Sequence, residues 1–399
     1  MQSKDVVVGG DVTSSSSSHS PKVINVNDYG AGGGDASSDT QAFEKAWEEA
    51  CYSSNNNGQT ILMVPKACNN YQLKPIRFSG PCKSEIQVQL EGTIEATDEA
   101  SDYSKDRRHW LVFDSVKKLS VNGGGIIDGN GKTWWQKSCK RDKSMPCKEA
   151  PTALTFLDCS SLNVEDLSIE NAQQMHVSFQ GCTNVIVSGV NVTSPGDSPN
   201  TDGIHVTNSH NVQISNAVIG TGDDCISIVS GSRNILATNI TCGPGHGISI
   251  GSLGAGSSAA YVSGVTVKGA KISGTSNGVR IKTWQGGSGL ASYIQFKHIV
   301  MENVTNPILI DQNYCDKPKK PCPKQKSAVQ ISNVLYEDIS GTSASDVAVR
   351  FDCSESVPCQ DIMLEDINLQ RVEDGKDVEA SCNNVQLSYY GDVNPSCCS

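Results

Sequence analysis

Three residues that can bind or release protons recur at an interval of 22 residues in this chain. They are Asp202, Asp224 and His246. A parallel β-helix uses about this many residues in one coil, and its stacked strands lie roughly 4.8 Å apart. Equal spacing by one coil would place the three side chains in a row on one face. Acids gathered on one surface in this way are suited to hydrolysing a glycosidic bond.

Asp223 adds a further acid directly beside Asp224. Glycoside hydrolysis needs one carboxylic acid to protonate the leaving oxygen and a second carboxylate as nucleophile or as base for water. Clustered carboxylates raise one another's pKa, which keeps one acid protonated near the working pH. Adjacent strand residues point to opposite faces, so both acids reach one cleft only at a bend or bulge. Gly220 and Gly222 favour such a bend.

Glycine on both sides of His246 leaves the imidazole exposed and lets the backbone approach a ligand. We expect His246 to orient or tune a neighbouring acid. Further along, Arg280 and Lys282 alternate with Ile281, so both cations should share one strand face. Arginine can hold a carboxylate with two hydrogen bonds and lysine adds a point charge, which favours an acidic sugar. Tyr314 follows at one long coil and is expected to offer a stacking surface for a sugar.

The bulk composition restricts the partners. The 399 residues carry 43 acidic and 32 basic side chains, a net charge of −11. This argues against nucleic acid as a partner and requires a local basic patch for any polyanionic sugar. No metal-ligand spacing and no Gly-x-Ser-x-Gly nucleophile motif is present. No apolar run is long enough to cross a membrane.

The cysteines point to an oxidising compartment. Sixteen cysteines without a zinc-finger pattern favour disulfides, and three Asn-x-Thr sequons begin at Asn191, Asn239 and Asn303. Together they predict a secreted protein. No signal peptide is visible at the start, which predicts a processed or truncated chain. The expected bridges are Cys225–Cys242, Cys315–Cys322, Cys353–Cys359, and Cys382 with Cys397 or Cys398.

The order of segments predicts one solenoid. Residues 1–22 read as a disordered, Ser-rich tail, and residues 23–29 alternate like a strand. A helix is expected from an N-cap at Asp39 or Thr40, and its apolar stripe would cap the end of the solenoid. From about residue 60, short β-rich runs repeat. Residues 184–190 resemble 211–217, and the runs starting at 294, 329 and 362 continue at offsets of 35 and 33. This self-similarity predicts a parallel β-helix over residues 23–399 as a single catalytic domain.

Four short strings in this chain resemble those of a known enzyme family. They are Asn-Thr-Asp at 200–202, Gly-Asp-Asp at 222–224, Gly-His-Gly at 245–247 and Arg-Ile-Lys at 280–282. In this order and spacing they look like the signature of the polygalacturonases, the pectin-degrading enzymes of glycoside hydrolase family twenty-eight. The resemblance covers roughly residues 23–398. It is strongest to the secreted, endo-acting plant enzymes of cell separation, such as organ abscission and fruit dehiscence.

The resemblance implies a right-handed parallel β-helix and inverting hydrolysis of α-1,4-galacturonan. Asp223 would be the general acid, Asp202 and Asp224 would hold and deprotonate the attacking water, and His246 would tune the acid. The substrate-binding residues would be Asn200, Arg280, Lys282 and Tyr314. The family needs no metal and no organic cofactor. The expected partner is pectin, with the protein a monomer in the plant cell wall; proteinaceous inhibitors are conceivable further partners.

Several alternatives stay open at this point. Exo action depends on loops that close one end of the cleft, and sequence does not show them. A rhamnogalacturonan hydrolase shares the paired acids but lacks the Arg-x-Lys pair. A pectate lyase shares the architecture but eliminates with calcium and a basic residue. A pectin-binding wall protein with a decayed site is the non-enzymatic alternative, and the intact Asp202, Asp223 and Asp224 argue against it.

Overall fold

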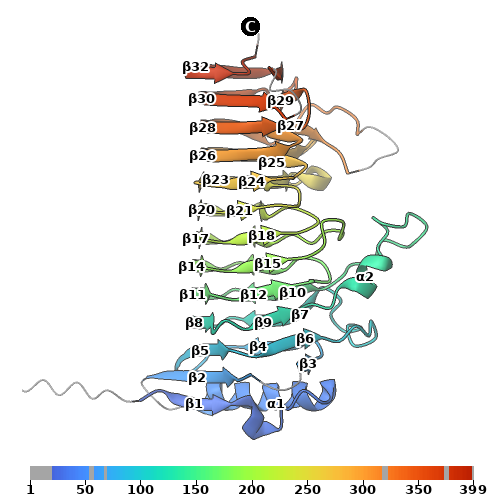
Figure 1. Cartoon of the computed structure of the whole chain (residues 1–399), viewed down its shortest axis with the longest axis vertical. Helices are drawn as coiled ribbons and strands as arrows, with labels where there is room; N and C mark the ends of the chain where they lie inside the picture. The colour runs from blue at the N-terminus through green and yellow to red at the C-terminus, as the bar shows by residue number, and fades with distance from the viewer. Residues whose placement is uncertain (1–19, 54–57, 67–69, 317–321, 373–376, 398–399) are drawn as a thin grey trace, which may run out of the picture.

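The structure is a computed structural model that describes residues 20–53, 58–66, 70–316, 322–372 and 377–397. Most of the predicted N-terminal tail, residues 1–19, lies outside the described residues. Figure 1 shows the chain as a stack of coils, with α1 beside β1 at one end and β32 at the other. All pairings between the named strands are parallel, and the architecture is the predicted right-handed parallel β-helix.

Three tracks of strands run along the stack. One track forms a sheet of eleven strands, and it carries the candidate site. Its strands are β4 (Ile76–Ser79), β7 (His109–Asp114), β10 (Thr152–Leu157), β13 (Val177–Gln180), β16 (Ile204–Thr207), β19 (Ile226–Ile228), β22 (Ile248–Leu253), β25 (Asn277–Trp284), β27 (Asn306–Tyr314), β29 (Val347–Asp352) and β31 (Glu379–Asn383).

The other two tracks merge into one sheet of 21 strands, because the long strands β26, β28 and β30 run through the bend between them. The first of these tracks is β1 (Lys22–Asn25), β2 (Gln59–Val64), β5 (Glu85–Leu90), β8 (Lys117–Asn122), β11 (Ser160–Glu165), β14 (Thr183–Ser188), β17 (His210–Ser215), β20 (Arg233–Thr238), β23 (Ala259–Lys268), β26 (Ser288–Val304), β28 (Gln330–Ser343), β30 (Cys359–Arg371) and β32 (Val385–Asn394). The second is β3 (Tyr71–Leu73), β6 (Thr93–Ala96), β9 (Ile126–Asp128), β12 (Ser168–Glu170), β15 (Asn191–Thr193), β18 (Val218–Gly220), β21 (Thr241–Cys242) and β24 (Lys271–Ser273).

Apolar residues fill the interior of the coils in continuous rows. Phe78, Phe113, Phe156 and Phe179 stack face to face on successive strands, with ring centroids 4.9 to 5.4 Å apart. Parallel in-register strands bring equivalent residues together, so one apolar position per coil is enough to extend the core. The core therefore grows along the axis and holds the outward-facing rows at a fixed spacing.

The N-terminal end is capped by a helix, as predicted, but the predicted start of the helix was wrong. The helix α1 (Ala36–Glu48) has Asp35 as its N-cap, whose carboxylate accepts a hydrogen bond from Ser38 N at 2.9 Å. Asp39 lies inside the first turn, where its buried carboxylate accepts hydrogen bonds from Gly32 N and Gln72 N and so ties the helix to β3. A π-helical turn, η2 (Glu49–Ser53), follows α1 directly.

Aromatic contacts fix this cap to the solenoid. The Trp47 indole lies 5.2 Å from the ring of Phe78 and 5.7 Å from that of Phe113, and its N–H donates to Ser79 O at 3.0 Å. The apolar stripe of α1 thus covers the start of the Phe row, which would otherwise face water.

Two other predictions about the coils need correction. The strand predicted over residues 23–29 is β1, which ends at Asn25, and a 3₁₀ turn, η1 (Val26–Tyr29), follows. The repeat at 184–190 and 211–217 is confirmed, since Asn211 Nδ2 donates to Asn184 Oδ1 at 3.0 Å on neighbouring coils. The alignment of 294 with 329 was wrong by five residues, because Ile294 pairs with Val334. A loop preceding β28 causes the shift.

Disulfides join described cysteines in six pairs, and they include all four that the sequence predicted. For Cys382 the partner is Cys397. The two remaining bridges are Cys51–Cys82, which links η2 to the loop before β5, and Cys139–Cys147. Among the cysteines that the structure describes, Cys159 and Cys182 are free, and both are buried.

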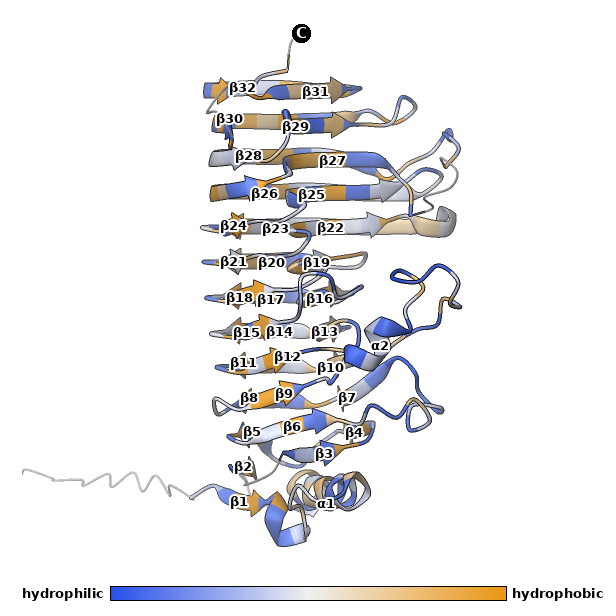
Figure 2. Ribbon diagram, turned by 45° about the vertical axis from the view of Figure 1, so that its right-hand side comes forward, coloured by the Kyte–Doolittle hydropathy of each residue, from blue (hydrophilic) through white to orange (hydrophobic). Residues whose placement is uncertain are grey.

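The remaining helical segments are short. The helix α2 (Lys132–Gln136) and the segment after it project from the solenoid, and Figure 2 shows that they are largely hydrophilic. A 3₁₀ turn, η3 (Ala255–Ser257), precedes β23. Within the described ranges, none of the helices has the length and apolar character needed to cross a membrane.

Candidate active site

The three residues spaced by 22 precede three neighbouring strands of the eleven-stranded sheet. Asp202, Asp224 and His246 each stand two residues before the first residue of β16, β19 and β22, respectively. These strands pair in register, with Ile204 against Ile226 and Ile226 against Ile248. The equal spacing in the sequence is therefore an equal position on three successive coils.

Both Asp223 and Asp224 reach this cleft because the chain bends between β18 and β19. The bend depends on Gly222, where an added Cβ would lie only 1.9 Å from Ser198 O. Gly245 is constrained as well: its φ is +147°, and an added Cβ would lie 2.6 Å from Asp223 O. Glycine is therefore required at both positions so that the turns before β19 and β22 can pack against each other.

The Asp224 side chain is buried under two cations. Its Oδ1 accepts hydrogen bonds from Arg280 at 2.7 Å and from Ser249 Oγ at 2.8 Å, and its Oδ2 accepts from Lys282 Nζ at 2.8 Å. The carboxylate side chain is 2% exposed, and those of Arg280 and Lys282 are 12% and 10% exposed. A buried carboxylate needs such partners because its desolvation is unfavourable. As predicted, both cations share one strand face, with Ile281 buried between them.

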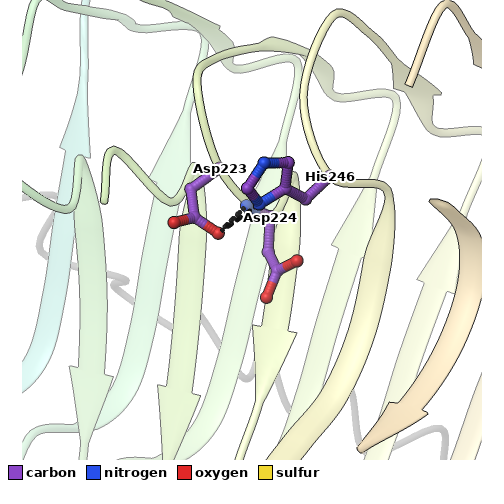
Figure 3. Close-up of side chains that lie close together, drawn as sticks. All are labelled: Asp223, Asp224 and His246. Atoms are coloured by element: carbon purple, nitrogen blue, oxygen red, sulfur yellow. Dashed lines mark hydrogen bonds and ion pairs between the residues drawn. The ribbon is translucent and has the colours of Figure 1, made fainter. Parts of the chain in front are cut away.

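Asp223 is paired with His246. His246 Nδ1 lies 3.0 Å from Asp223 Oδ1, and Figure 3 shows this contact, with the Asp224 carboxylate turned away from the ring. Burial raises the pKa of Asp223, but the hydrogen bond and charge of His246, with the charge of Lys282, outweigh burial and bring that pKa below its usual value. Asn200 Nδ2 donates to the other oxygen, Asp223 Oδ2, at 3.2 Å.

Asp202 has a different environment. Its side chain is buried and accepts a hydrogen bond from Ser227 Oγ at 2.7 Å. Burial, followed by repulsion from Asp223 and Asp224, raises the pKa of Asp202 well above its usual value, although Ser227 and Lys282 oppose the shift. The cluster therefore contains acids whose pKa values are pushed apart, which is typical of a site that needs one protonated and one ionised carboxyl group.

Tyr314 lies at the edge of the same cluster. It pairs with Trp284, two residues beyond Lys282, so its position follows from a register shift in β25 and β27. Its ring lies 5.5 Å from Lys282 Nζ and 5.3 Å from the Trp284 ring. Burial, followed by the charge of Asp316, raises the pKa of Tyr314 to about 12, so the phenol stays neutral.

A cavity of about 430 Å³ opens over these residues. An adjoining cavity of about 740 Å³ extends toward α2 and shares Asn200, Lys140 and Asp316 with the first. Its lining includes four basic side chains: Arg107, Lys137, Lys140 and Lys148. The cleft thus continues beyond the acids into a surface that suits a polyanion, even though the whole protein is negatively charged.

The donor atoms of Asp223, Asp224 and His246 lie within 4.8 Å of one another, close enough to surround a small cation. Arg280 and Lys282 already neutralise Asp224, however, and two positive side chains at the same carboxylate oppose binding of a metal ion. The sequence prediction that the chemistry uses acids without a metal remains a prediction.

Sequence analysis missed His205, Ser227 and Ser249. These residues also recur every 22 residues, three positions after Asp202, Asp224 and His246, and they pair in register on β16, β19 and β22. The same periodicity would have found them. They were overlooked because serine within a strand is common and carries no signal of its own.

This fold and site define a glycoside hydrolase, and comparison with known proteins gives its family. Residues 54–398 match the model of the glycosyl hydrolases family 28. The chain belongs to this family.

Curated relatives share about half of their residues with this chain. "Polygalacturonase-2" of Solanum lycopersicum is 58% identical over 378 residues, which cover 95% of this chain and 81% of that protein. "Polygalacturonase QRT2" of Arabidopsis thaliana is 54% identical over 379 residues, covering 95% of this chain and 85% of that protein. The predicted resemblance to plant polygalacturonases is confirmed.

Solved structures share the fold at low sequence identity. The endo-xylogalacturonan hydrolase from Aspergillus tubingensis superposes with a TM-score of 0.76 at 24% identity, covering 92% of this chain and 100% of that chain. The polygalacturonase from Erwinia carotovora ssp. carotovora gives a TM-score of 0.74 at 20% identity, covering 95% and 100%. At this identity the likeness establishes the architecture alone.

Proposed function

We propose that this protein is an endo-polygalacturonase, which hydrolyses internal α-1,4-galacturonosyl bonds of de-esterified pectin with inversion. The observation that carries the proposal is the meeting of Asp223 and Asp224 in one cleft, with Arg280 and Lys282 beside them. Acids supply the chemistry of glycoside hydrolysis, and the two cations can receive the carboxylate of a galacturonate. The polygalacturonase names of the curated relatives support the same substrate.

In this proposal Asp223 protonates the leaving oxygen. The Asp223–His246 pair can hold one proton between Oδ1 and Nδ1, which lie 3.0 Å apart. A galacturonate carboxylate that enters the cleft brings a further negative charge, which raises the pKa of Asp223 and moves the proton onto the acid. Asp202 and Asp224 hold the attacking water, and the water loses its proton to this pair. Asn200 and Tyr314 contact the sugar at the cleavage point.

Inversion is supported by the family resemblance and not by the separation of the acids. The nearest donor atoms of Asp223 and Asp224 lie within 4.8 Å, whereas carboxyl groups of inverting enzymes are typically about 6.5–9.5 Å apart. The pair that binds water includes Asp202, on the preceding coil, so this one distance does not describe the whole site. NMR of the first-formed reducing end reports its anomeric configuration, and an α product from the α-linked polymer would refute inversion.

Endo action is supported by the cavity that continues past the acids toward α2, with Arg107, Lys137 and Lys148 along it. A chain that extends well beyond the cleavage point can bind there. A cleft closed near the acids would give exo action instead. The rhamnogalacturonan hydrolase alternative is disfavoured because Arg280 and Lys282 both point to the site.

We infer a role outside the cell, in loosening the plant cell wall during cell separation. Six disulfides among the described residues fit an oxidising compartment. The side chains of the three sequon asparagines are exposed, so glycans could be attached without unfolding: Asn191, Asn239 and Asn303. A monomeric protein and glycan occupancy remain predictions.

The testing experiment follows the products from polygalacturonate over time. Reducing ends, viscosity and ultraviolet absorbance are recorded on the same sample. A rapid loss of viscosity with mixed oligomers and no absorbance change is expected. Release of monomer with slow loss of viscosity would establish the exo alternative, and rising absorbance would show elimination by a lyase. Binding without any new reducing ends would make it a pectin-binding protein.

A further inference from the structure

Asp202 and Asp224 are each held by a serine from the next coil. Ser249 Oγ donates to Asp224 Oδ1 at 2.8 Å, and Ser227 Oγ donates to Asp202 Oδ2 at 2.7 Å. Ser227 and Ser249 pair in register, so the two hydrogen bonds are equivalent on successive coils. The site therefore repeats one structural unit, an aspartate with its serine, twice.

The two units differ in the group that donates to the serine. Arg280 Nε donates to Ser249 Oγ at 3.0 Å, and the same guanidinium reaches Asp224 directly. For Ser227, the neighbour is His205 Nδ1, at 2.8 Å. An arginine is always a cation and only donates, whereas an imidazole can be neutral and can accept as well. The His205 unit thus has a property that the Arg280 unit lacks.

The hydrogen bonds fix the tautomer of His205 whenever Asp202 is ionised. A serine hydroxyl has one proton, and an ionised carboxylate can only accept. The Ser227 proton must then point to Asp202, so His205 Nδ1 must carry a proton and donate to Ser227. A neutral imidazole has one N–H, which leaves Nε2 as an acceptor. Asp202 must be ionised to accept a proton from water, so this is the arrangement of the working site.

The acceptor Nε2 has no hydrogen-bond partner in the described part of the chain, and the half-buried His205 lines the cavity over the acids. Burial lowers the pKa of His205 to about 4, with Asp224 opposing this shift and Lys282 adding to it. The ring is therefore neutral at the pH values at which Asp202 could act. A sugar in this cleft offers hydroxyl groups, which are hydrogen-bond donors.

We propose that His205 is a substrate-binding residue whose Nε2 accepts a hydrogen bond from a sugar hydroxyl, while its Nδ1–H, through Ser227, orients the Asp202 carboxylate. The inference rests on the proposed function and deepens it. One side chain would then report that a sugar is seated and hold the base in place at the same time. The charged groups that face Asp202 are Asp223, Asp224 and Lys282, and none of them changes in the variants below.

Two substitutions at His205 separate its two nitrogens. In His205→Asn, the amide nitrogen can take the place of Nδ1 and still donate to Ser227, but nothing replaces Nε2. In His205→Gln, the longer amide reaches the position of Nε2 but no longer that of Nδ1. Loss of one neutral hydrogen bond to substrate predicts a KM about 2- to 12-fold higher for His205→Asn, with kcat within about 2-fold. For His205→Gln we expect the KM to change little and kcat to fall by about 10-fold.

Ser227→Ala tests the connection to Asp202. Without the Ser227 donor the ionised form of Asp202 is less favoured, so the pKa of Asp202 rises further. The base is then protonated up to a higher pH, and the acidic limb of the kcat/KM profile moves to higher pH. Ser178→Ala is the matched control, since Ser178 pairs with His205 one coil earlier and does not line the cavity. Its profile should equal that of the unchanged protein.

The outcomes are read on the full chain with oligogalacturonates of defined length as substrate, and thermal unfolding shows whether each variant folds. An unchanged KM in a folded His205→Asn would overturn the substrate contact. An unmoved acidic limb in a folded Ser227→Ala would overturn the connection to Asp202. A parent protein that cannot cleave polygalacturonate would instead refute the proposed function, so the two failures are distinguishable.

Discussion

His246 contacts Asp223, although the residue that stands opposite His246 on the preceding coil is Asp224. The backbone register places Ile226 against Ile248, and hence Asp224 level with His246. The bend at Gly222 turns the Asp223 side chain into the space beside the imidazole, with Nδ1 and Oδ1 3.0 Å apart, while Asp224 turns down to Arg280 and Lys282. Each acid thus acquires its own partner.

This division of partners predicts the effect of removing the imidazole. In His246→Leu, Asp223 loses the hydrogen bond and charge that lower its pKa, so burial dominates and the pKa rises. A general acid must be protonated, and therefore the basic limb of the kcat/KM profile should move to higher pH. The measurement is the pH dependence of reducing-end release. His246→Gln, which can keep a neutral donor, should move the limb less. A basic limb that moves to lower pH would contradict the role of His246.

Replacement of the acid itself should abolish turnover but not binding. Asp223→Asn keeps the size of the side chain and its contact with Asn200, but it has no proton to give. General acids typically contribute about 10²–10⁴-fold to the rate, so kcat should fall by this factor. Binding is measured by the rise in the melting temperature when oligogalacturonate is added. Equal activity of the variant would remove Asp223 from the mechanism.

Lys282 should be important for both stability and substrate binding. Its Nζ is one of three donors to the buried Asp224 carboxylate, and Lys282→Met leaves one oxygen without its partner. An unsatisfied buried charge predicts a loss of about 1–3 kcal/mol in the free energy of unfolding, together with a higher KM for polygalacturonate. Chemical denaturation measures the first effect. In a Lys282→Met/Asp224→Asn double variant the stability should largely return, and additive losses would contradict the pairing.

The sequence predicted the parts of this site that depend on periodicity. Equal intervals of 22 residues are enough to place Asp202, Asp224 and His246 on successive coils, because in-register parallel strands keep equivalent residues together. The partner of each side chain was not predictable in this way. It depends on the bend at Gly222 and on side-chain rotamers, which the spacing does not encode.

Predictions were least accurate where a loop or a cap interrupts the period. The helix start was placed at Asp39 because an acid before an apolar stripe resembles an N-cap, whereas Asp35 is the N-cap. Asp39 instead accepts hydrogen bonds from residues of a loop and of β3, which sequence alone does not bring together. The position of Tyr314 likewise follows from a register shift between β25 and β27.

Asp311 predicts a pH-dependent stability that is independent of catalysis. Burial, followed by the charge of Asp352 on the next strand, raises the pKa of Asp311 to about 6. Because this value is above that of the unfolded chain, the protonated form is favoured in the folded protein, and the resulting stability is lost as the pH rises through about 6. Asp311→Asn should therefore be more stable at pH 7 by on the order of 1–2 kcal/mol and show little change at pH 4.

Thermal unfolding of the Asp311→Asn variant and of the unchanged protein at both pH values measures this difference. Asn retains the Oδ1 acceptor for Asn313 N, so the hydrogen bond of 3.0 Å is preserved. Asp352→Asn is the matched control, since it removes the neighbouring charge and should give a smaller gain at pH 7. Equal stabilisation at pH 4 and pH 7 would show that the gain does not come from titration of Asp311.

Asp316 should weaken substrate binding in the present protein. Lys140 Nζ lies 3.2 and 3.3 Å from the two oxygens of Asp316, and both residues line the cleft beside Asn200. The pair connects two disulfide-closed loops, Cys139–Cys147 and Cys315–Cys322. Both side chains are about half exposed, so the ion pair adds little stability. Its carboxylate, however, competes with the substrate for Lys140 and repels a polyanion.

Asp316→Asn should therefore lower the KM for polygalacturonate by about 2- to 5-fold at low ionic strength, and Lys140→Ala should raise it. The difference between variants should shrink as salt approaches 0.5 M, where screening acts within roughly 4–5 Å. Melting temperatures of both variants should stay close to that of the unchanged protein. An Asp316→Asn variant with a higher KM would mean that the ion pair holds the two loops in the conformation that binds substrate, and that Asp316 assists binding through Lys140.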